Sequence, residues 1–367
     1  MRKWIIGSLL LLIALGIYWR TRPKKSPLAE SYIGDANVIL WSSTAAVRQE
    51  VAQLHWGEAV EVFGHNGAQV EIRTAQGATG WIDSRSLLDA DAWQSEKHLL
   101  ESVQRMPLQA AGHTKVFSNV HLTPRRDAQR IYQLPGGVPV AVVARAYAEI
   151  PPSGSGSATG DSPKKEDWLL VYGPAPAAAK DAGGVVSGEV TLTPAAVSTD
   201  LATGTTAAQR QAASTGEKTP PIAGWVVARF VSYDLPETIR DYASSAAIRP
   251  VAWFVLNRVP DAGVQRPQFL LAGSKSGENP ECDFSMLRVY TWDAKKQRYE
   301  TAYVEGNLCG MLPIRIGQQS SGSDPEFRFK ERRDGATEDA LYRMRQTTVR
   351  RVREGAPSKK PTSRKRH

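Results

Sequence analysis

The sequence contains few of the residue patterns on which catalysis and metal binding depend. Only two cysteines occur in 367 residues, and the six histidines are scattered along the chain. No Cys-x-x-Cys or His-x-x-x-His pair sets metal ligands on one element. Glycine-rich phosphate loops and Gly-x-Ser-x-Gly elbows are also absent. We therefore expect no catalytic residues, no metal and no cofactor, and a function based on binding.

The two cysteines, Cys282 and Cys309, lie 27 positions apart in one expected domain. A disulfide closing such a loop would stabilise the fold by about 3–4 kcal/mol in the chain-entropy model, and it would require an oxidising compartment. The alternative is two buried, reduced thiols. A nucleophilic Cys282 would need a histidine to activate it, and the only histidine that follows is His367.

Positive charge is concentrated at the two ends of the chain. There are 46 Lys and Arg against 37 Asp and Glu, and ten of the cations fall between Leu341 and His367. Six more precede residue 26, so the body between is mildly acidic. Residues 354–367 are expected to form a disordered basic tail. Such a tail would attract an anionic lipid or polymer outside the cytoplasm, or nucleic acid without sequence specificity inside it. A merely solubilising tail is the alternative.

One long apolar run lies near the amino terminus. Trp4 to Trp19 is uncharged and has Arg and Lys on both sides. A membrane-spanning helix takes about 17 to 25 apolar residues, and flanking aromatic and basic side chains suit the interface. We expect Trp4–Trp19 to form an uncleaved transmembrane helix, followed by a polar stalk from Pro23 to about Ser31, so that residues 1–30 hold the anchor and the basic stalk. A cleaved signal peptide is the alternative.

Three short sequence segments occur twice in the same order, which indicates a duplicated module. The separation grows along the chain, so the second copy must contain two insertions. The matched pairs are Gln53–Val62 with Gln133–Val142, Gln69–Ile72 with Trp168–Val171, and Gly80–Leu88 with Gly224–Ser232, at separations of 80, 99 and 144 positions.

The order apolar-x-Leu-x-x-Gly-x-x-Val-x-Val, then a short strand, then Gly-Trp-Val/Ile resembles the bacterial SH3-type (Src-homology-3-like) domain family. The resemblance covers residues 35–88 and 113–235. It implies two small β-barrels of the kind found in cell-envelope proteins beside wall-binding or wall-cutting modules. Independently, the alternation of Val60 with Val62 is that of a half-buried strand.

These features together predict an all-β fold with an N-terminal transmembrane helix. Two tandem SH3-like barrels are followed by a β-rich C-terminal domain of no assigned family. The expected segments are the anchor and stalk (1–30), the first barrel (31–88), a linking helix (89–112), the second barrel (113–235) with disordered insertions near 150–166 and 173–223, the C-terminal domain (236–353) and the tail (354–367).

Two parts of this architecture have a more detailed pattern. In the linking helix, apolar residues at helical spacing from Trp93 to Met106 are expected to dock on one or both barrels. In the C-terminal domain, a short helix over Pro236–Ala247 precedes strand-like runs. These runs cover 251–256, 268–272, 286–292 and 299–303, with 327–330 and 341–344 pairing through the Asp334-Gly335 turn.

Aromatic and arginine side chains are the candidate ligand contacts of the barrels. The tryptophans concerned are Trp41, Trp56, Trp81, Trp168 and Trp225. Core packing is the alternative for the last three, whereas Trp41 and Trp56 lie in or near loops. Arg85 and Arg229 recur at matching places, where they either brace the end of a barrel through a salt bridge or contact an anionic ligand.

The missing catalytic motifs predict a non-enzymatic protein, and the apolar run predicts its anchor in the inner membrane. The resemblance and the cysteines predict that its body faces the periplasm or the outside. Its barrels would bind peptidoglycan or cell-wall peptides. One alternative is a scaffold or sensor that binds another envelope protein. The other is a cytoplasmic polyanion binder that acts through the tail, without specific recognition of nucleic acid.

Overall fold

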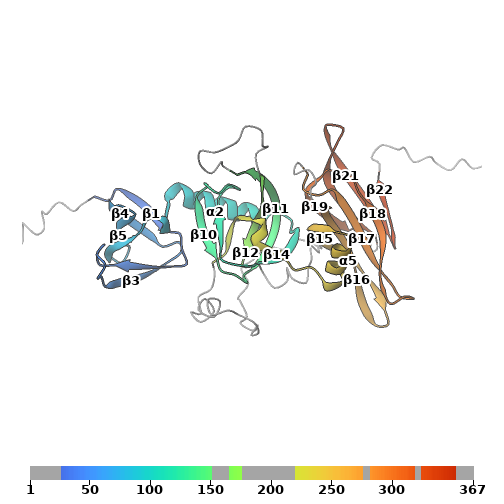
Figure 1. Ribbon diagram of the computed structural model, residues 1–367, viewed down its shortest axis with the longest axis horizontal. Coiled ribbons are helices and arrows are strands. Elements are labelled where there is room, and N and C mark those ends of the chain that lie inside the picture. Colours follow the sequence, from blue (N-terminus) through green and yellow to red (C-terminus); the bar gives the residue numbers. More distant parts are fainter. Residues whose placement is uncertain (1–25, 151–164, 176–219, 276–281, 319–323, 353–367) are drawn as a thin grey trace, which may run out of the picture. The chain divides into compact units, whose positions relative to one another are not determined.

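The computed structural model describes residues 26–150, 165–175, 220–275, 282–318 and 324–352. This part of the chain is mostly β and forms four antiparallel sheets (Figure 1). It divides into two units, Met1–Asp91 and Ala92–His367. The expected anchor, most of both insertions and the basic tail lie outside the described residues. Within the described residues, no helix is long and apolar enough to cross a membrane.

The first unit contains one seven-stranded sheet, which we call the first repeat. Its strand order is β3-β2-β6-β5-β4-β1-β7. Alternating apolar residues such as Leu40, Val60 and Ile72 are buried in its core. Its elements are β1 (Ala29–Ile33), β2 (Asn37–Trp41), β3 (Glu50–His55), β4 (Ala59–Asn66), β5 (Gln69–Thr74), β6 (Thr79–Asp83), the 3-10 helix η1 (Ser84–Ser86) and β7 (Leu87–Asp89).

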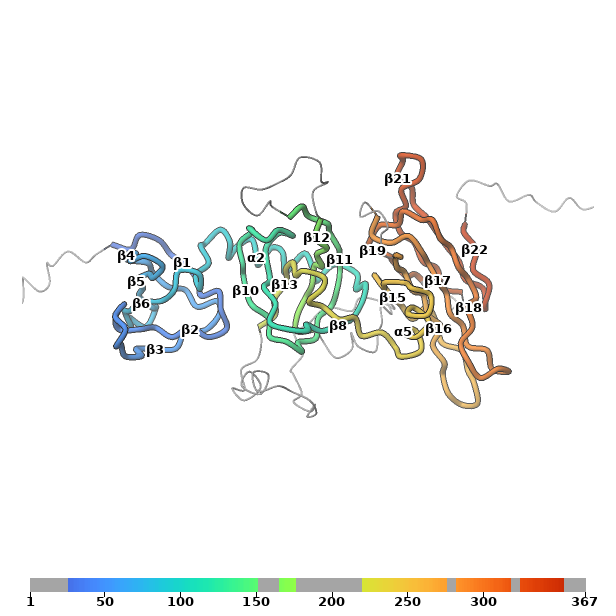
Figure 2. Tube along the Cα trace, in the orientation of Figure 1, coloured from blue at the N-terminus to red at the C-terminus, as the bar shows by residue number. Residues whose placement is uncertain are grey.

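The second unit begins with a sheet of the same topology, the second repeat. Its order, β10-β9-β13-β12-β11-β8-β14, matches that of the first repeat strand for strand. Figure 2 follows the chain through these strands. They are β8 (Ala110–Thr114), β9 (Ser118–His121), β10 (Arg130–Leu134), β11 (Pro139–Glu149), β12 (Lys165–Gly173), β13 (Ile222–Val227), the 3-10 helix η2 (Ala228–Phe230) and β14 (Val231–Tyr233).

The strand register confirms the duplication seen in the sequence. Ile72 lies opposite Gly80 in the first repeat, and their counterparts Val171 and Gly224 lie opposite each other in the second. Both positions require glycine for the same reason, which is lack of space for a side chain. A Cβ on Gly80 would lie 2.5 Å from the Trp41 carbonyl oxygen. A Cβ on Gly224 would lie 2.4 Å from a methyl group of Val120 on β9. Neighbouring strands therefore approach too closely at this point for any other residue.

Helix α2 (Ala90–Gln104) packs on the second repeat. Leu99, Leu100 and Val103 contact a cluster that includes Leu170 and Tyr172. The first repeat has Glu71 and Arg73 at the corresponding places on β5. Only the second repeat therefore has strands that are apolar on both faces, and that second apolar face receives the helix.

Three expected boundaries differ from the structure. The stalk was expected to reach Ser31, but β1 starts at Ala29 and pairs with β4 and β7. The linking helix ends at Gln104, and Met106 is 37% exposed instead of packed. The segment up to residue 112 also contains the start of β8. Both short strands lack a hydrophobic alternation of their own and are held by pairing with distant strands.

The C-terminal part of the second unit consists of α5 (Glu237–Ser245) and two four-stranded sheets that share one core. The turn at Asp334-Gly335 is present, with positive φ at both residues, and Phe327 pairs with Tyr342. Strands β19 and β22 were not expected. The strands are β15 (Ile248–Asp261), β16 (Val264–Lys275), β17 (Met286–Asp293), β18 (Arg298–Glu305), β19 (Gly310–Gln318), β20 (Pro325–Arg333), β21 (Ala336–Arg345) and β22 (Thr348–Val352).

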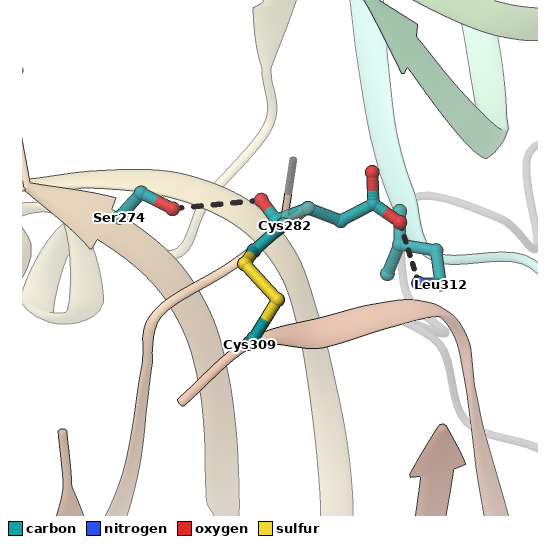
Figure 3. Close-up of a disulfide and its surroundings, with 5 residues drawn as sticks. Ser274, Cys282, Cys309 and Leu312 are labelled. Atoms are coloured by element: carbon teal, nitrogen blue, oxygen red, sulfur yellow. Dashed lines mark hydrogen bonds between the residues drawn. A yellow bond between two sulfur atoms is a disulfide. The ribbon is translucent and has the colours of Figure 1, made fainter. Parts of the chain in front are cut away.

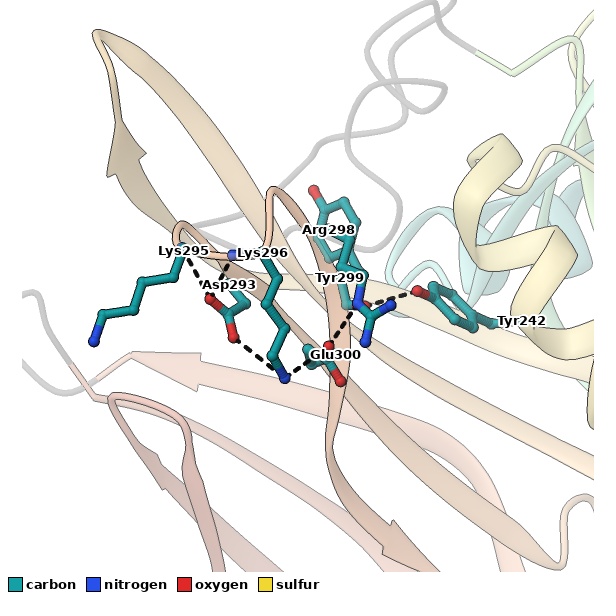
Figure 4. Close-up of polar contacts among 7 residues, drawn as sticks. All are labelled: Tyr242, Asp293, Lys295, Lys296, Arg298, Tyr299 and Glu300. Carbon is teal, nitrogen blue, oxygen red and sulfur yellow. Dashed lines mark hydrogen bonds and ion pairs between the residues drawn. The ribbon is translucent and has the colours of Figure 1, made fainter.

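The β17–β18 hairpin is closed by the polar loop that the sequence predicts (Figure 4). The Asp293 carboxylate accepts bonds from the backbone N–H groups of Lys295 and Lys296. Beside the hairpin, the Tyr242 hydroxyl on α5 donates to the Tyr299 carbonyl oxygen at 2.7 Å. This bond fastens α5 to the sheet, which matters because α5 lines a cleft described below.

Candidate binding surfaces

In the first repeat, two candidate tryptophans lie side by side at the surface. Trp41 on β2 and Trp81 on β6 are register partners, and both are half-buried. The guanidinium of Arg48 lies over the Trp41 ring, 4.3 Å from its centre. Ile39, two residues before Trp41, is 38% exposed, and Val47 in the adjoining loop is 93% exposed. We call Ile39, Trp41, Val47, Arg48 and Trp81 the aromatic surface.

The corresponding positions of the second repeat have a structural role. His121 and Trp225 are register partners there, in place of Trp41 and Trp81. His121 is 8% exposed, and its Nδ1 donates to the Ala128 carbonyl oxygen at 3.0 Å. Trp168, 1% exposed, meets His121 edge-on, and Trp225 packs against the α2 cluster. Trp168 therefore packs in the interior, as the core alternative predicts, whereas Trp225 is half-buried.

The remaining candidate tryptophan and the two matched arginines lie outside the strands, in a turn and in the two 3-10 helices. Trp56 is half-buried in the turn between β3 and β4. Arg85 and Arg229 occupy the middle of η1 and η2. Arg85 pairs with Asp83 at 2.7 Å. That pair is solvent-exposed and contributes little stability.

Arg229 belongs to a more buried ion-pair network. Its Nη1 donates to the Glu166 carboxylate at 2.7 Å, and Arg126 binds the same carboxylate through two nitrogens. The Glu166 side chain is only 5% exposed, and the bonds from Arg126 keep its pKa below the usual range. Glu166 belongs to β12, although the sequence assigned it to the end of an insertion. Arg229 thus forms the bracing salt bridge that was one of the two expectations, whereas Arg85 forms an exposed pair with Asp83, two residues before it.

Cys282 and Cys309 form a disulfide (Figure 3). The bond joins the segment before β17 to the start of β19. The adjoining Asp283 is held through both its side chain and its backbone. Its carboxylate accepts a hydrogen bond from the Leu312 N–H at 2.7 Å, and its carbonyl oxygen accepts one from the Arg145 side chain at 2.8 Å. Burial raises the pKa of Asp283 above its ordinary value.

Neither Arg145 nor Arg48 is among the residues that the sequence singled out. Arg145 lies on β11 with a side chain that is 3% exposed, and it binds the Asp167 carboxylate through Nε at 2.7 Å and through Nη2. A single arginine within the apolar run Val140–Ala148 was the available signal, because a buried charge needs a partner. Its third nitrogen reaches Asp283, so one side chain connects the second repeat to the disulfide-bonded segment.

Among the described residues, no group of three or more His, Cys, Asp or Glu side chains could hold a metal ion. Comparison with known proteins found no matching family model and no similar protein of curated function. Four chains of solved structures match. One is NlpC2 from Trichomonas vaginalis, 9% identical over 90% of this chain and 98% of that chain, with a TM-score of 0.16. At that TM-score the likeness carries no argument about fold or function.

Proposed function

We propose that this protein is a non-enzymatic binding protein of the cell envelope, and that its first repeat, an SH3-like barrel, binds cell-wall peptides. The proposal places a membrane anchor at the amino terminus and the two repeats on the outer side of the inner membrane. The disulfide supports this placement, because such bonds persist in oxidising compartments. The cell-wall ligand follows from the resemblance to bacterial SH3-type domains.

The observation that carries the proposal is the difference between the two repeats at one pair of positions. In the second repeat these positions are filled by His121, which is 8% exposed and bonded to the Ala128 carbonyl oxygen, and by Trp225, which is half-buried against the cluster that receives α2. In the first repeat Trp41 and Trp81 stay half-exposed with a guanidinium above one ring. Exposed aromatic rings suit stacking against a peptide or sugar, and an arginine suits a carboxylate. The aromatic surface therefore has the chemistry that a wall peptide with free carboxylates requires.

Retention on purified cell wall tests this proposal. The protein from residue 26 onward keeps β1 intact and should sediment with isolated wall. We expect Trp41→Ala to weaken retention by about tenfold, since losing one stacking aromatic at a binding surface costs about 1–2 kcal/mol. Phe117→Ala, which removes a 51% exposed aromatic from the second repeat, is the matched control and should bind normally.

Two results would contradict the proposal. Retention no greater than that of an unrelated protein of similar charge would remove the wall as ligand. Equal losses in Trp41→Ala and Phe117→Ala would remove the aromatic surface as the site. If the wall is not bound but the aromatic surface captures an envelope protein by cross-linking at Val47, the scaffold function replaces the proposed one.

A further inference from the structure

A cleft within residues 92–367 has a strongly cationic lining that wall binding by the first repeat does not use. It has a volume of about 510 Å³ and lies between the second repeat and the segment from α5 to β15. Of its fifteen lining residues, five are basic and one is acidic. The charged residues of the lining are Lys115, Arg145, Asp167, Arg229, Arg240 and Arg249.

The two walls of this cleft are held together by buried contacts. The Gln109 side chain, just before β8, is fully buried and exchanges hydrogen bonds with the backbone N–H and carbonyl of Ile314 on β19. Its own carbonyl oxygen accepts from the Trp253 N–H on β15 at 3.0 Å. On the other wall, Tyr242 fixes α5 to the sheet. The cleft is therefore formed by elements that are fastened to one another.

The floor of the cleft is neutral and rigid. Arg145 and Asp167 pair there, and Arg145 is also bonded to the Asp283 carbonyl oxygen. Tyr233, which lines the cleft beside them, stays protonated because burial raises its pKa well above the ordinary value. Leu235 and Ile248 add apolar surface. The one acidic residue of the lining is thus already neutralised by the buried arginine.

The rim, in contrast, carries a surplus of positive charge. Lys115 and Arg249 are exposed, and neither forms an ion pair within the described part of the chain. Arg240 is exposed and donates one N–H to the Leu235 carbonyl oxygen. Arg229 shares Glu166 with Arg126 and remains 57% exposed. Like charges around one concave surface repel unless an anion lies between them, and they raise the local concentration of anions.

We propose that this cleft binds a small ligand carrying two or more phosphate or carboxylate groups. Arginine guanidinium groups match both oxyanions in geometry and form their strongest hydrogen bonds with them. A volume of about 500 Å³ suits a compact molecule and is too small for a folded partner. The neutral floor and the apolar wall would contact the uncharged part of the ligand. The site is independent of the aromatic surface, so either can fail without the other.

Isothermal titration calorimetry tests this proposal. The full-length protein in detergent is titrated with two probes, inorganic tripolyphosphate and citrate. In about 150 mM salt, where long-range attraction is screened, we expect at least one probe to bind with a Kd below about 1 mM. Binding of tripolyphosphate alone identifies a phosphate ligand, and binding of citrate alone identifies a carboxylate ligand. Binding of both supports the shared chemistry.

Matched variants separate the cleft from the charge of the whole protein. Lys115→Ser with Arg249→Ser removes two charges from the rim and should weaken binding by about tenfold or more. Lys295→Ser with Lys330→Ser removes two exposed charges elsewhere and should leave the Kd within about twofold. Absence of binding by both probes would overturn the proposal. Equal weakening in the two double variants would overturn it as well, because it would show that attraction is nonspecific.

Discussion

Replacing Glu96 by glutamine tests a buried carboxyl group of the second unit whose pKa is raised. Glu96 lies on the face of α2 that packs on the second repeat, and its side chain is fully buried. Its carboxylate oxygens have no well-formed hydrogen bond among the described residues. Burial raises its pKa from 4.5 to about 7, and the nearby Ala223 N–H and Lys97 offset this only in part.

The sign of the effect follows from the protons bound in each state. Between pH 4.5 and about 7 the folded protein keeps a proton on Glu96 that the unfolded chain has lost. The contribution of Glu96 to stability must therefore fall as the pH rises through this window and level off above it. The total loss of folding free energy due to Glu96 is about 3 kcal/mol, because each unit of pKa shift is worth about 1.4 kcal/mol.

The Glu96→Gln variant keeps the shape and removes the charge. We expect it to match the wild-type protein near pH 5 and to be more stable by about 2–3 kcal/mol near pH 8. Urea unfolding at several pH values, followed by tryptophan fluorescence, measures the difference. Glu101→Gln, at an exposed position of the same helix, is the control and should show no such trend. A stability difference between the wild-type protein and the Glu96→Gln variant that stays constant from pH 5 to pH 8 would refute the reasoning.

Two further predictions concern stability. Reduction, or replacement of Cys282 and Cys309 by serine, should lower the free energy of unfolding of the second unit by about 3–4 kcal/mol, since the bond closes a 27-residue loop; a loss under about 1 kcal/mol in urea unfolding would contradict this. Gly224→Ala should cost about 1–3 kcal/mol because its methyl group would overlap Val120. Gly317→Ala, whose methyl group would meet nothing within 4 Å, is the control; equal melting temperatures for the two variants would contradict the close approach.

Much of the fold could be predicted because it is repeated or locally encoded. Three pairs of similar segments, at separations of 80, 99 and 144 positions, give the alignment of the two repeats, and the strand pairing follows that alignment. The turn at Asp334-Gly335 was recognisable because both residues tolerate positive φ. Strands β1 and β8 escaped notice because their short sequences gain a strand conformation only by pairing with β4 and β11.

The candidate site was predictable only in part. The sequence singled out Trp41 and Trp81, but it could not show that Arg48, from the loop after β2, lies over one of the rings. It also could not separate exposed tryptophans from packed ones. Trp225 and Trp81 occupy the same place in their repeats and are both half-buried, but Trp225 packs against the cluster that receives α2.

By itself, the sequence determined the duplication and the glycines between closely spaced strands. It left open whether α2 packs on one repeat or on both, although the residues that decide this are local, because side-chain alternation along one strand decides which faces are apolar. The second repeat has an apolar outer face on β12 because Leu170 and Tyr172 stand where the first repeat has Glu71 and Arg73. The tertiary structure alone decided the buried environment of Glu96 and the cationic cleft. Lys115 and Arg249 are 134 positions apart, and no local pattern can indicate that folding brings them to one rim.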